Sequence, residues 1–441
     1  MFKRLLIANR GEIAVRIIRA CQELDIETVA VYSDADVDSL HVKLADYACN
    51  IGPEDASLSY LNGHNIIAAA HAMQVDAIHP GYGFLSENAD FAEMTTKAGF
   101  IFIGPRAETI RKVGNKDAAR EAMLKAGLPM ASGSDQITNV EDACQVADTI
   151  GYPVILKPIA GGGGKGMVIA NSQDELIAAV GKADITTTAF YLEKYIAEAR
   201  HIEVQIMADN YGHILHLGER ECSLQRRNQK ILEEAPSSAL TSEMRQKVGD
   251  LAIRAAKSVH YTNIGTVEFL MDKNNGEFYF MEINPRIQVE HAITEMITGI
   301  DLVRKQIRIA AGEPLNMKQE SIVFQGHAIE CRINAEDPSF NFLPSPGQIE
   351  FYHQPGGPNV RVDSGVCAGS VVQPYYDSLI AKVIVHGRTR GDAIRIMKRA
   401  LAEFLVTGVK TTISFHQEIL SDPYFCSGDI DTQFVYKRMF Q

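Results

Sequence analysis

Apolar runs and amphipathic stretches alternate along the N-terminal part of the chain. Residues 5–8 are Leu-Leu-Ile-Ala and predict a buried strand, residues 16–24 show the spacing of a helix, and residues 28–32 predict a second strand. Further apolar runs at residues 77–78 and 100–103 are separated by helical stretches. Strands that alternate with helices in this way are typical of a parallel sheet. The pattern therefore predicts an N-terminal α/β domain.

The rest of the chain follows a different pattern. Residues 322–383 predict a strand-rich segment, and residues 392–404 predict a helix after it. With boundaries near Lys112 and Lys318, we expect three units of mixed α/β and α+β class.

A run of glycines lies between two predicted strands. Residues 153–157 and 167–170 have the apolar character of strands, and residues 161–166 between them read Gly-Gly-Gly-Gly-Lys-Gly. These glycines formally satisfy the dinucleotide motif G-x-G-x-x-G, but that motif requires a helix after the loop. A P-loop requires Ser or Thr after its lysine, whereas Gly166 follows Lys165. A glycine loop between antiparallel strands can still bring backbone N–H groups close to an anion. We therefore expect a lid over phosphates, with a hairpin that binds no ligand as the alternative.

A second predicted hairpin carries two carboxylates. Residues 266–271 and 277–284 predict strands around Asn-Asn-Gly. If those three residues form the loop, Glu268 lies opposite Glu282, and Asn284 shares their face. Facing carboxylates need a cation, and oxygen ligands suit Mg²⁺ or Mn²⁺. The alternative is a solvated face on which the glutamates are splayed apart.

The second strand of this hairpin is expected to continue to Glu290, because polar side chains keep one parity from Glu282 onward. A straight strand would separate Glu282 from Glu290 by roughly 26 Å, too far for one metal ion. Arg286 is then a candidate anion clamp and Glu290 a candidate general base beside Gln288. The face predicts phosphate chemistry next to an acceptor pocket.

Composition limits the classes of function. The chain has 441 residues, 46% of them hydrophobic, and a net charge of -12, which disfavours binding to nucleic acid. The seven cysteines are scattered singly, which indicates a reducing compartment rather than disulfides or zinc. Neither a signal peptide nor an apolar segment long enough to span a membrane is present in the sequence, so we expect a cytoplasmic protein.

Several motifs in order resemble the biotin carboxylase family of the ATP-grasp superfamily. They are Ala-Asn-Arg-Gly-Glu-Ile-Ala at residues 8–14, His-Pro-Gly-Tyr-Gly-Phe-Leu-Ser-Glu-Asn at 79–88, Gln-Arg-Arg at 225–227, Asn-Pro-Arg-Ile-Gln-Val-Glu-His at 284–291 and Pro-Tyr-Tyr-Asp-Ser at 374–378. The resemblance covers nearly the whole chain. It implies a three-domain ATP-grasp architecture: an N-terminal parallel-sheet domain over residues 1–113, an ATP-grasp domain over 114–318 with a glycine-rich lid at about 130–200, and a strand-rich C-terminal domain over 319–441.

The resemblance also implies roles for individual residues, matched motif by motif. ATP would contact Lys116, Lys157, Gly161, Gly162, Gly163, Gly164, Lys165, Gly166, Glu193, Lys194, Ile196, His201, Gln225 and Asn228. Two Mg²⁺ or Mn²⁺ ions would be held by Glu268, Glu282 and Asn284, and bicarbonate by Lys230, Arg286, Gln288 and Val289. Biotin would lie near Arg332 and Tyr82, and the catalytic residues would be Glu290, Arg332, Arg286 and Lys230.

The implied mechanism begins with Glu290, which deprotonates bicarbonate for attack on the γ-phosphate of ATP. The resulting carboxyphosphate yields CO₂ and phosphate, the phosphate takes the ureido proton of biotin, and Arg332 stabilises the enolate oxygen. Three departures from the family pattern stand out. Asn228 replaces an expected histidine, Ala292 replaces a common proline, and the lid between Met167 and Tyr191 is several residues short.

The expected partners follow from what the chain lacks. There is no Met-Lys-Met attachment motif for biotin, because Met317-Lys318 and Met397-Lys398 lack the second methionine. We therefore expect a separate biotin carboxyl carrier protein and carboxyltransferase subunits on other chains, and the resemblance to the family implies a homodimer. Acetyl-CoA is the favoured final acceptor, with propionyl-CoA and pyruvate as alternatives.

Other function classes remain open from the sequence. One is an ATP-grasp ligase with a different acceptor, and another is a nucleotide-binding regulatory subunit. A dehydrogenase would need its fingerprint in the first strand-to-helix turn, where residues 9–12 read Asn-Arg-Gly-Glu.

Overall fold

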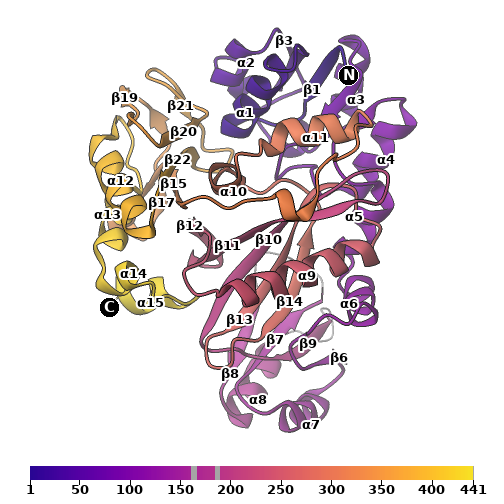
Figure 1. The fold of residues 1–441 in the computed structure, drawn as a ribbon, viewed down its shortest axis with the longest axis vertical. Helices are drawn as coiled ribbons and strands as arrows, with labels where there is room; N and C mark the ends of the chain where they lie inside the picture. Colours follow the sequence, from indigo (N-terminus) through magenta and orange to yellow (C-terminus); the bar gives the residue numbers. More distant parts are fainter. Residues whose placement is uncertain (160–165, 184–188, 441) are drawn as a thin grey trace.

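Three sheets organise the chain in the computed structural model, which describes residues 1–159, 166–183 and 189–440. In Figure 1 the N-terminal sheet, a small lid sheet and a large central sheet occupy different parts of the molecule. Gly161 to Gly164 and Lys165, expected to contact ATP, lie outside the described residues. Within those residues, no helix has the length and apolar character needed to cross a membrane.

The N-terminal sheet is parallel, as the alternating pattern predicts. Its strand order is β3-β2-β1-β4-β5. The strands are β1 (Arg4–Ile7), β2 (Glu27–Tyr32), β3 (Tyr47–Asn50), β4 (Ala77–His79) and β5 (Ile101–Phe102), and the helices are α1 (Gly11–Gln22), α2 (Leu40–Leu44), α3 (Gly63–Ala72), α4 (Ala89–Lys97) and α5 (Ala107–Gly114).

The carboxyl ends of β1 and β4 are tied together by one amide. The Asn9 side chain donates to the carbonyls of Pro80 and Tyr82, each at 2.7 Å. Gly11 begins α1 with a left-handed φ of +66°. These contacts bring the two N-terminal motifs to one edge of the sheet, which is where ligands bind in open parallel sheets.

The lid has its own antiparallel sheet, with strand order β6-β9-β7-β8. The strands predicted on either side of the glycine run are β7 and β8, and they pair as expected. Helices α7 and α8 enclose a small apolar core with this sheet. The elements are α6 (Lys116–Lys125), which precedes the lid, and β6 (Gly133–Ile137), α7 (Val140–Ile150), β7 (Val154–Pro158), β8 (Val168–Ala170), α8 (Gln173–Lys182) and β9 (Phe190–Lys194).

The large sheet has eight antiparallel strands in the order β14-β13-β10-β11-β12-β15-β22-β20. It passes without a break across the boundary expected near Lys318, because β12 pairs directly with β15. Its elements are β10 (Ala199–Ala208), β11 (Ile214–Arg226), β12 (Gln229–Ala235), α9 (Ser242–Ser258), β13 (Asn263–Asp272), β14 (Phe278–Asn284), α10 (His291–Thr298), α11 (Leu302–Ala310), β15 (His327–Asn334), β20 (Val360–Ser364) and β22 (Leu379–Gly387).

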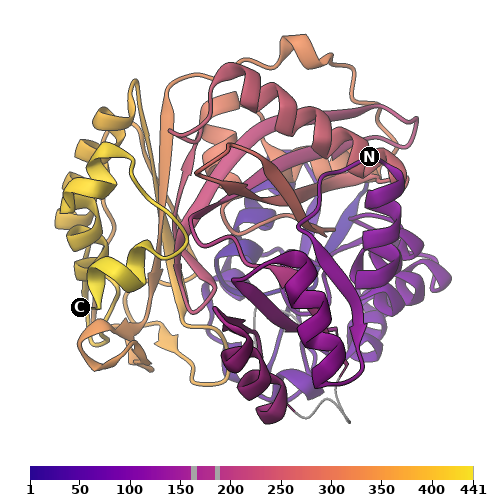
Figure 2. The ribbon, with the colours of Figure 1, turned by 90° about the horizontal axis from the view of Figure 1, so that it is seen from below.

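The C-terminal helices lie on one side of this sheet, in yellow in Figure 2. They pack with β15 and β22 around a large apolar core. The remaining strands and α-helices are β16 (Glu336–Asp337), β17 (Leu343–Pro344), β18 (Gly347–Gln348), β19 (Phe351–His353), β21 (Val371–Val372), α12 (Arg390–Glu403), β23 (Leu405–Thr407), α13 (Ile413–Ser421), α14 (Pro423–Ser427) and α15 (Phe434–Met439).

The β13–β14 hairpin pairs Glu268 with Glu282, as predicted, but the register of the two strands near the turn differs from the expected one. Near the turn, Met271 pairs with Phe278, one position away from the expected register. A β-bulge then leaves Met281 without a partner and restores the pairing of the two glutamates.

The prediction of a strand that runs on to Glu290 is wrong. Strand β14 ends at Asn284, and α10 begins at His291 with Glu290 as its N-cap. Pro285 follows the last strand residue and has no N–H with which to continue the sheet. The chain therefore turns back, and the expected separation of roughly 26 Å does not apply.

Candidate active site

A cleft of about 1580 Å³ collects residues from the N-terminal part of the chain, from the lid and from the large sheet. That volume is ample for a nucleotide and a second substrate. Most of the predicted site residues line it, namely Tyr82, Lys116, Lys157, Glu193, Lys194, Ile196, His201, Gln225, Asn228, Lys230, Glu268, Glu282, Asn284, Arg286, Gln288, Val289 and Arg332. Among the described residues, two predicted site residues do not line it: Gly166, and Glu290, which is 0% exposed.

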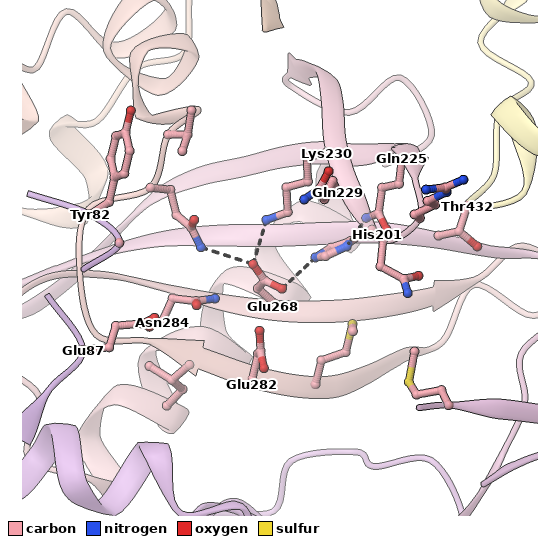
Figure 3. Close-up of a pocket in the computed structure, with 18 of the residues that line it drawn as sticks. Tyr82, Glu87, His201, Gln225, Gln229, Lys230, Glu268, Glu282, Asn284 and Thr432 are labelled. Carbon is pink, nitrogen blue, oxygen red and sulfur yellow. Dashed lines mark hydrogen bonds and ion pairs between the residues drawn. The ribbon is translucent and has the colours of Figure 1, made fainter. Parts of the chain in front are cut away.

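Glu268 lies at the centre of the cleft and accepts three hydrogen bonds (Figure 3). Lys230 donates to its Oε1 at 2.7 Å, Gln288 to the same oxygen at 3.2 Å, and His201 to Oε2 at 2.9 Å. Gln225 donates to the other ring nitrogen of His201, which leaves the proton on Nε2. Although burial opposes ionisation, Lys230 and His201 together lower the pKa of Glu268. The carboxylate is therefore charged at neutral pH.

Glu282 points at Glu268 from the neighbouring strand (Figure 3). Desolvation by the walls of the cleft raises the pKa of Glu282, and the negative charges of Glu268 and Glu87 raise it further. Across residues 1–159, 166–183 and 189–440, no hydrogen bond or ion pair reaches the side-chain carboxylate of Glu282. Two facing carboxylates, of which one has no partner, form with the neighbouring Asn284 side chain a donor set that fits Mg²⁺ or Mn²⁺; the Asn284 oxygen itself accepts from Arg286.

Glu290 is buried directly behind the cleft wall. Its carboxylate accepts from Lys230 and from Arg332, each at 2.9 Å. Burial alone would favour the protonated acid, but Lys230, Arg332 and Arg220 lower the pKa of Glu290 well below its usual range. Because Lys230 bonds both Glu268 and Glu290, one ammonium joins the candidate metal end to the candidate base.

Arg332 is fixed between two buried carboxylates. Its guanidinium bonds Glu233 at 2.6 Å and Glu290 at 2.9 Å. Burial, opposed by Arg332, raises the pKa of Glu233 to about 7. Tyr82 lines the same end of the cleft and donates its hydroxyl hydrogen to Glu12. The two residues expected near biotin thus share one end of the site.

Arg286 is held by its own segment. Its guanidinium donates to Gln288 Oε1 at 2.8 Å and Asn284 Oδ1 at 3.2 Å, and it approaches Glu87 at 3.3 Å. A guanidinium fixed in this way on the cleft wall is preorganised for an anion.

The end of the cleft that is expected to bind nucleotide contains several cations. Lys157 pairs with Glu193, and the Lys116 ammonium donates to the carbonyl of Pro158 at 3.1 Å. Lys194 differs, because its ammonium donates to the carbonyls of Gly151 at 2.9 Å and Tyr152 at 2.8 Å. Its charge is therefore satisfied within the lid.

Asn228 occupies a two-residue turn between β11 and β12. Arg226 pairs with Gln229, and Arg227 and Asn228 have φ values of 50° and 64°. Asparagine is favoured at left-handed turn positions, so it fits the backbone at this position.

Sequence reasoning missed several buried charges of the site. Glu203 bonds Arg220 and Lys230, and its carboxylate lies within 4.8 Å of ligand atoms of His201 and Glu268. The signal was the alternation of residues 201–205, His-Ile-Glu-Val-Gln, which places their polar side chains on one face of β10.

Comparison with known proteins agrees with this geometry. Family models match residues 1–110 (biotin carboxylase, N-terminal domain), 115–318 (carbamoyl-phosphate synthase L chain, ATP binding domain) and 330–437 (biotin carboxylase C-terminal domain). Biotin carboxylase 1 of Bacillus subtilis (strain 168) is 57% identical over 442 residues, which cover 99% of this chain and 98% of that protein.

Two solved structures are similar over the whole chain. The biotin carboxylase-beta-gamma-ATP complex from Campylobacter jejuni has a TM-score of 0.95 and 46% identity, and the match covers 99% of each chain. The biotin carboxylase domain dimer of Hydrogenobacter thermophilus 2-oxoglutarate carboxylase, in complex with MgADP, ADP and bicarbonate, has a TM-score of 0.93 and 48% identity, covering 100% of this chain and 98% of that one. With matching family models and relatives over its full length, the chain belongs to the biotin carboxylase family.

Proposed function

We propose that this chain uses ATP and bicarbonate to carboxylate biotin on a separate carrier protein, as the biotin carboxylase subunit of an acetyl-CoA carboxylase. The observation that carries the proposal is the ionised, buried Glu290, held by Lys230 and Arg332 beside the facing carboxylates of Glu268 and Glu282. The arrangement combines a base, an anion site and a metal site in one cleft.

Glu290 is the base of the first step. Its two cations keep it ionised at neutral pH, so it can accept the proton of bicarbonate. A bicarbonate ion bound by Arg286, Gln288 and Val289 would share Lys230 with Glu290. Sharing that cation raises the pKa of Glu290 toward the value that proton transfer needs.

The deprotonated bicarbonate attacks the γ-phosphate of ATP and forms carboxyphosphate. Lys116 and Lys157 lie at the nucleotide end of the cleft, where they neutralise phosphate charge. A divalent ion held by Glu268, Glu282 and Asn284 would supply further positive charge at the phosphates.

Biotin is carboxylated at the other end of the cleft. Carboxyphosphate breaks down to CO₂ and phosphate, and the phosphate removes the ureido proton of biotin. Arg332 then stabilises the enolate oxygen, because its guanidinium is always charged and is fixed by Glu233. Tyr82 forms part of the wall beside it.

Bicarbonate-dependent release of ADP by the purified chain, stimulated by free biotin, is the expected result of an assay. The control is the same assay after bicarbonate has been removed. Phosphate release that is indifferent to both bicarbonate and biotin would refute the carboxylase function and favour an ATP-grasp ligase with another acceptor.

The partners are part of the proposal. We expect a biotin carboxyl carrier protein, carboxyltransferase subunits that select acetyl-CoA, a homodimer and a cytoplasmic location. The solved biotin carboxylase domain of a 2-oxoglutarate carboxylase shares 48% identity, so overall similarity does not select the final acceptor. Identification of the transferase that copurifies with the chain tests this point, and a pyruvate or propionyl-CoA transferase would correct it.

A further inference from the structure

A fully buried lysine joins the three parts of the chain behind the cleft. Lys382, on β22, is 0% exposed. Its ammonium donates to the carbonyl of Val289 at 2.6 Å and pairs with Glu12 Oε1 at 3.2 Å. Asp363 lies at 3.9 Å. One ammonium thus meets an N-terminal helix, the loop before α10 and two C-terminal strands.

Both short contacts lead to residues of the site. Val289 directly precedes Glu290, so its carbonyl fixes the backbone from which the candidate base extends. The Glu12 oxygen that pairs with Lys382 also accepts the hydroxyl hydrogen of Tyr82. Lys382 therefore binds the residue that precedes the base, and it binds the carboxylate that accepts the hydrogen bond of the tyrosine at the biotin end.

The buried ammonium of Lys382 requires partners that compensate its charge. Burial of an ammonium is costly unless it is paired and hydrogen-bonded. Asp363 has its own partner, because Arg361 binds both of its oxygens. Glu12 is different: across the part of the chain that the structure describes, Lys382 is the one cation that pairs with it, and its Oε2 has no hydrogen-bond partner.

Building on the proposed function, we propose that Lys382 is a positioning residue for carboxylation. It holds the Val289 carbonyl, and with it Glu290, and it sets Tyr82 through Glu12. Loss of the lysine lets the bicarbonate and biotin walls of the cleft shift, while the nucleotide end, built on other strands and the lid, stays in place.

A purely structural ion pair would explain the same contacts, and a double substitution separates the two roles. Lys382→Met leaves Glu12 buried without a cation and is expected to destabilise the fold strongly. Lys382→Met combined with Glu12→Gln removes both charges and keeps an oxygen for the Tyr82 hydroxyl, so stability returns. The carbonyl of Val289 still lacks its donor in the double variant.

The double variant is expected to bind MgADP like the wild type. Its kcat/KM for bicarbonate should fall by about 100-fold, because small displacements of reacting groups cost that much. Leu251→Ala, on the buried face of α9 and away from the cleft, is the control for lost stability alone, and it should keep its kcat/KM.

The outcomes distinguish the inference from the function on which it rests. A wild type without bicarbonate-dependent ATP cleavage refutes the proposed function and this inference together. A wild type that turns over, beside a double variant with unchanged kinetics for bicarbonate and biotin, refutes the positioning role alone.

Discussion

Replacement of Glu290 by glutamine separates the chemistry of the site from its stability. Glutamine keeps the shape of the side chain but can neither accept the bicarbonate proton nor carry the charge that Lys230 and Arg332 now neutralise. Because Glu290 is 0% exposed, no water can take its place without a rearrangement of the cleft wall.

The cost in stability follows from the contacts that remain. Lys230 keeps Glu203 and Glu268, and Arg332 keeps Glu233, so neither cation is left alone. The loss is then limited to charge-assisted hydrogen bonds that become neutral, about 2 to 3 kcal/mol in the free energy of unfolding. That is less than the 3–5 kcal/mol, roughly, of an orphaned buried charge.

The cost in catalysis is expected to be larger. Loss of a general base lowers rates by about 100-fold to 10,000-fold. Bicarbonate-dependent ADP release should fall by this amount in Glu290→Gln, whereas the Kd for MgADP, measured by calorimetry, should stay within about twofold.

Glu234→Gln is a matched control from the same sheet. Glu234 is also buried, bonds His327 and Arg390 at 2.7 Å each, and neighbours Glu233 on β12, with its side chain on the opposite face. Burial opposes ionisation of Glu234, but His327 and Arg390 lower its pKa to about 2. Its substitution therefore also costs stability, but it should leave turnover unchanged. Unchanged turnover in Glu290→Gln, or an equal loss in the control, would refute Glu290 as the base.

Three further predictions concern the pH dependence, the metal and the nucleotide. Because burial raises the pKa of Glu233 from 4.5 to about 7, the folded chain binds this proton more tightly than the unfolded chain does, so the contribution to stability is present below 4.5 and is lost as the pH rises through about 7. Between about pH 5 and about pH 8, the free energy of unfolding measured in urea should fall more in the wild type than in Glu233→Gln. The same pH dependence in both proteins would contradict this. Glu282→Gln should raise the Mg²⁺ concentration for half-maximal ATP cleavage by about tenfold or more, and an unchanged Mg²⁺ titration would remove Glu282 from the metal site. Lys194→Met should change the Kd for ADP by less than about threefold, because the Lys194 ammonium is bonded within the lid. Lys157→Met should weaken ADP binding by about tenfold or more. The reverse order of the two effects would show that the lid rearranges around Lys194.

Local features of the chain were predictable from the sequence. The β13–β14 pairing of Glu268 with Glu282 and the antiparallel strands around the glycine run depend on residues close together in the chain, where strand periodicity and turn residues are informative. The parallel N-terminal sheet follows in the same way from its alternating strands and helices.

The convergence on Glu290 was not predictable from spacing. Lys230 and Arg332 meet there because β12 pairs with β15, about a hundred residues away, and Pro285 turns the chain back after β14. The alternation of side chains along a predicted strand can assign them to one face. It does not reveal that the strand ends and the chain turns back. Lys382 left a fainter signal, a single lysine within the apolar run of residues 379–385, which buried strands rarely contain without a partner.

The unbroken sheet from β14 to β20 has a mechanical consequence for the whole molecule. Strands that carry the nucleotide end and the biotin end are joined by one ladder of hydrogen bonds, so the distance between the two substrates is set by the frame and cannot be adjusted independently. The lid, in contrast, is a sheet of its own, joined to the frame through residues 126–132 and 195–198. A movement of the lid over the cleft would therefore break none of the hydrogen bonds that join the eight strands of the frame.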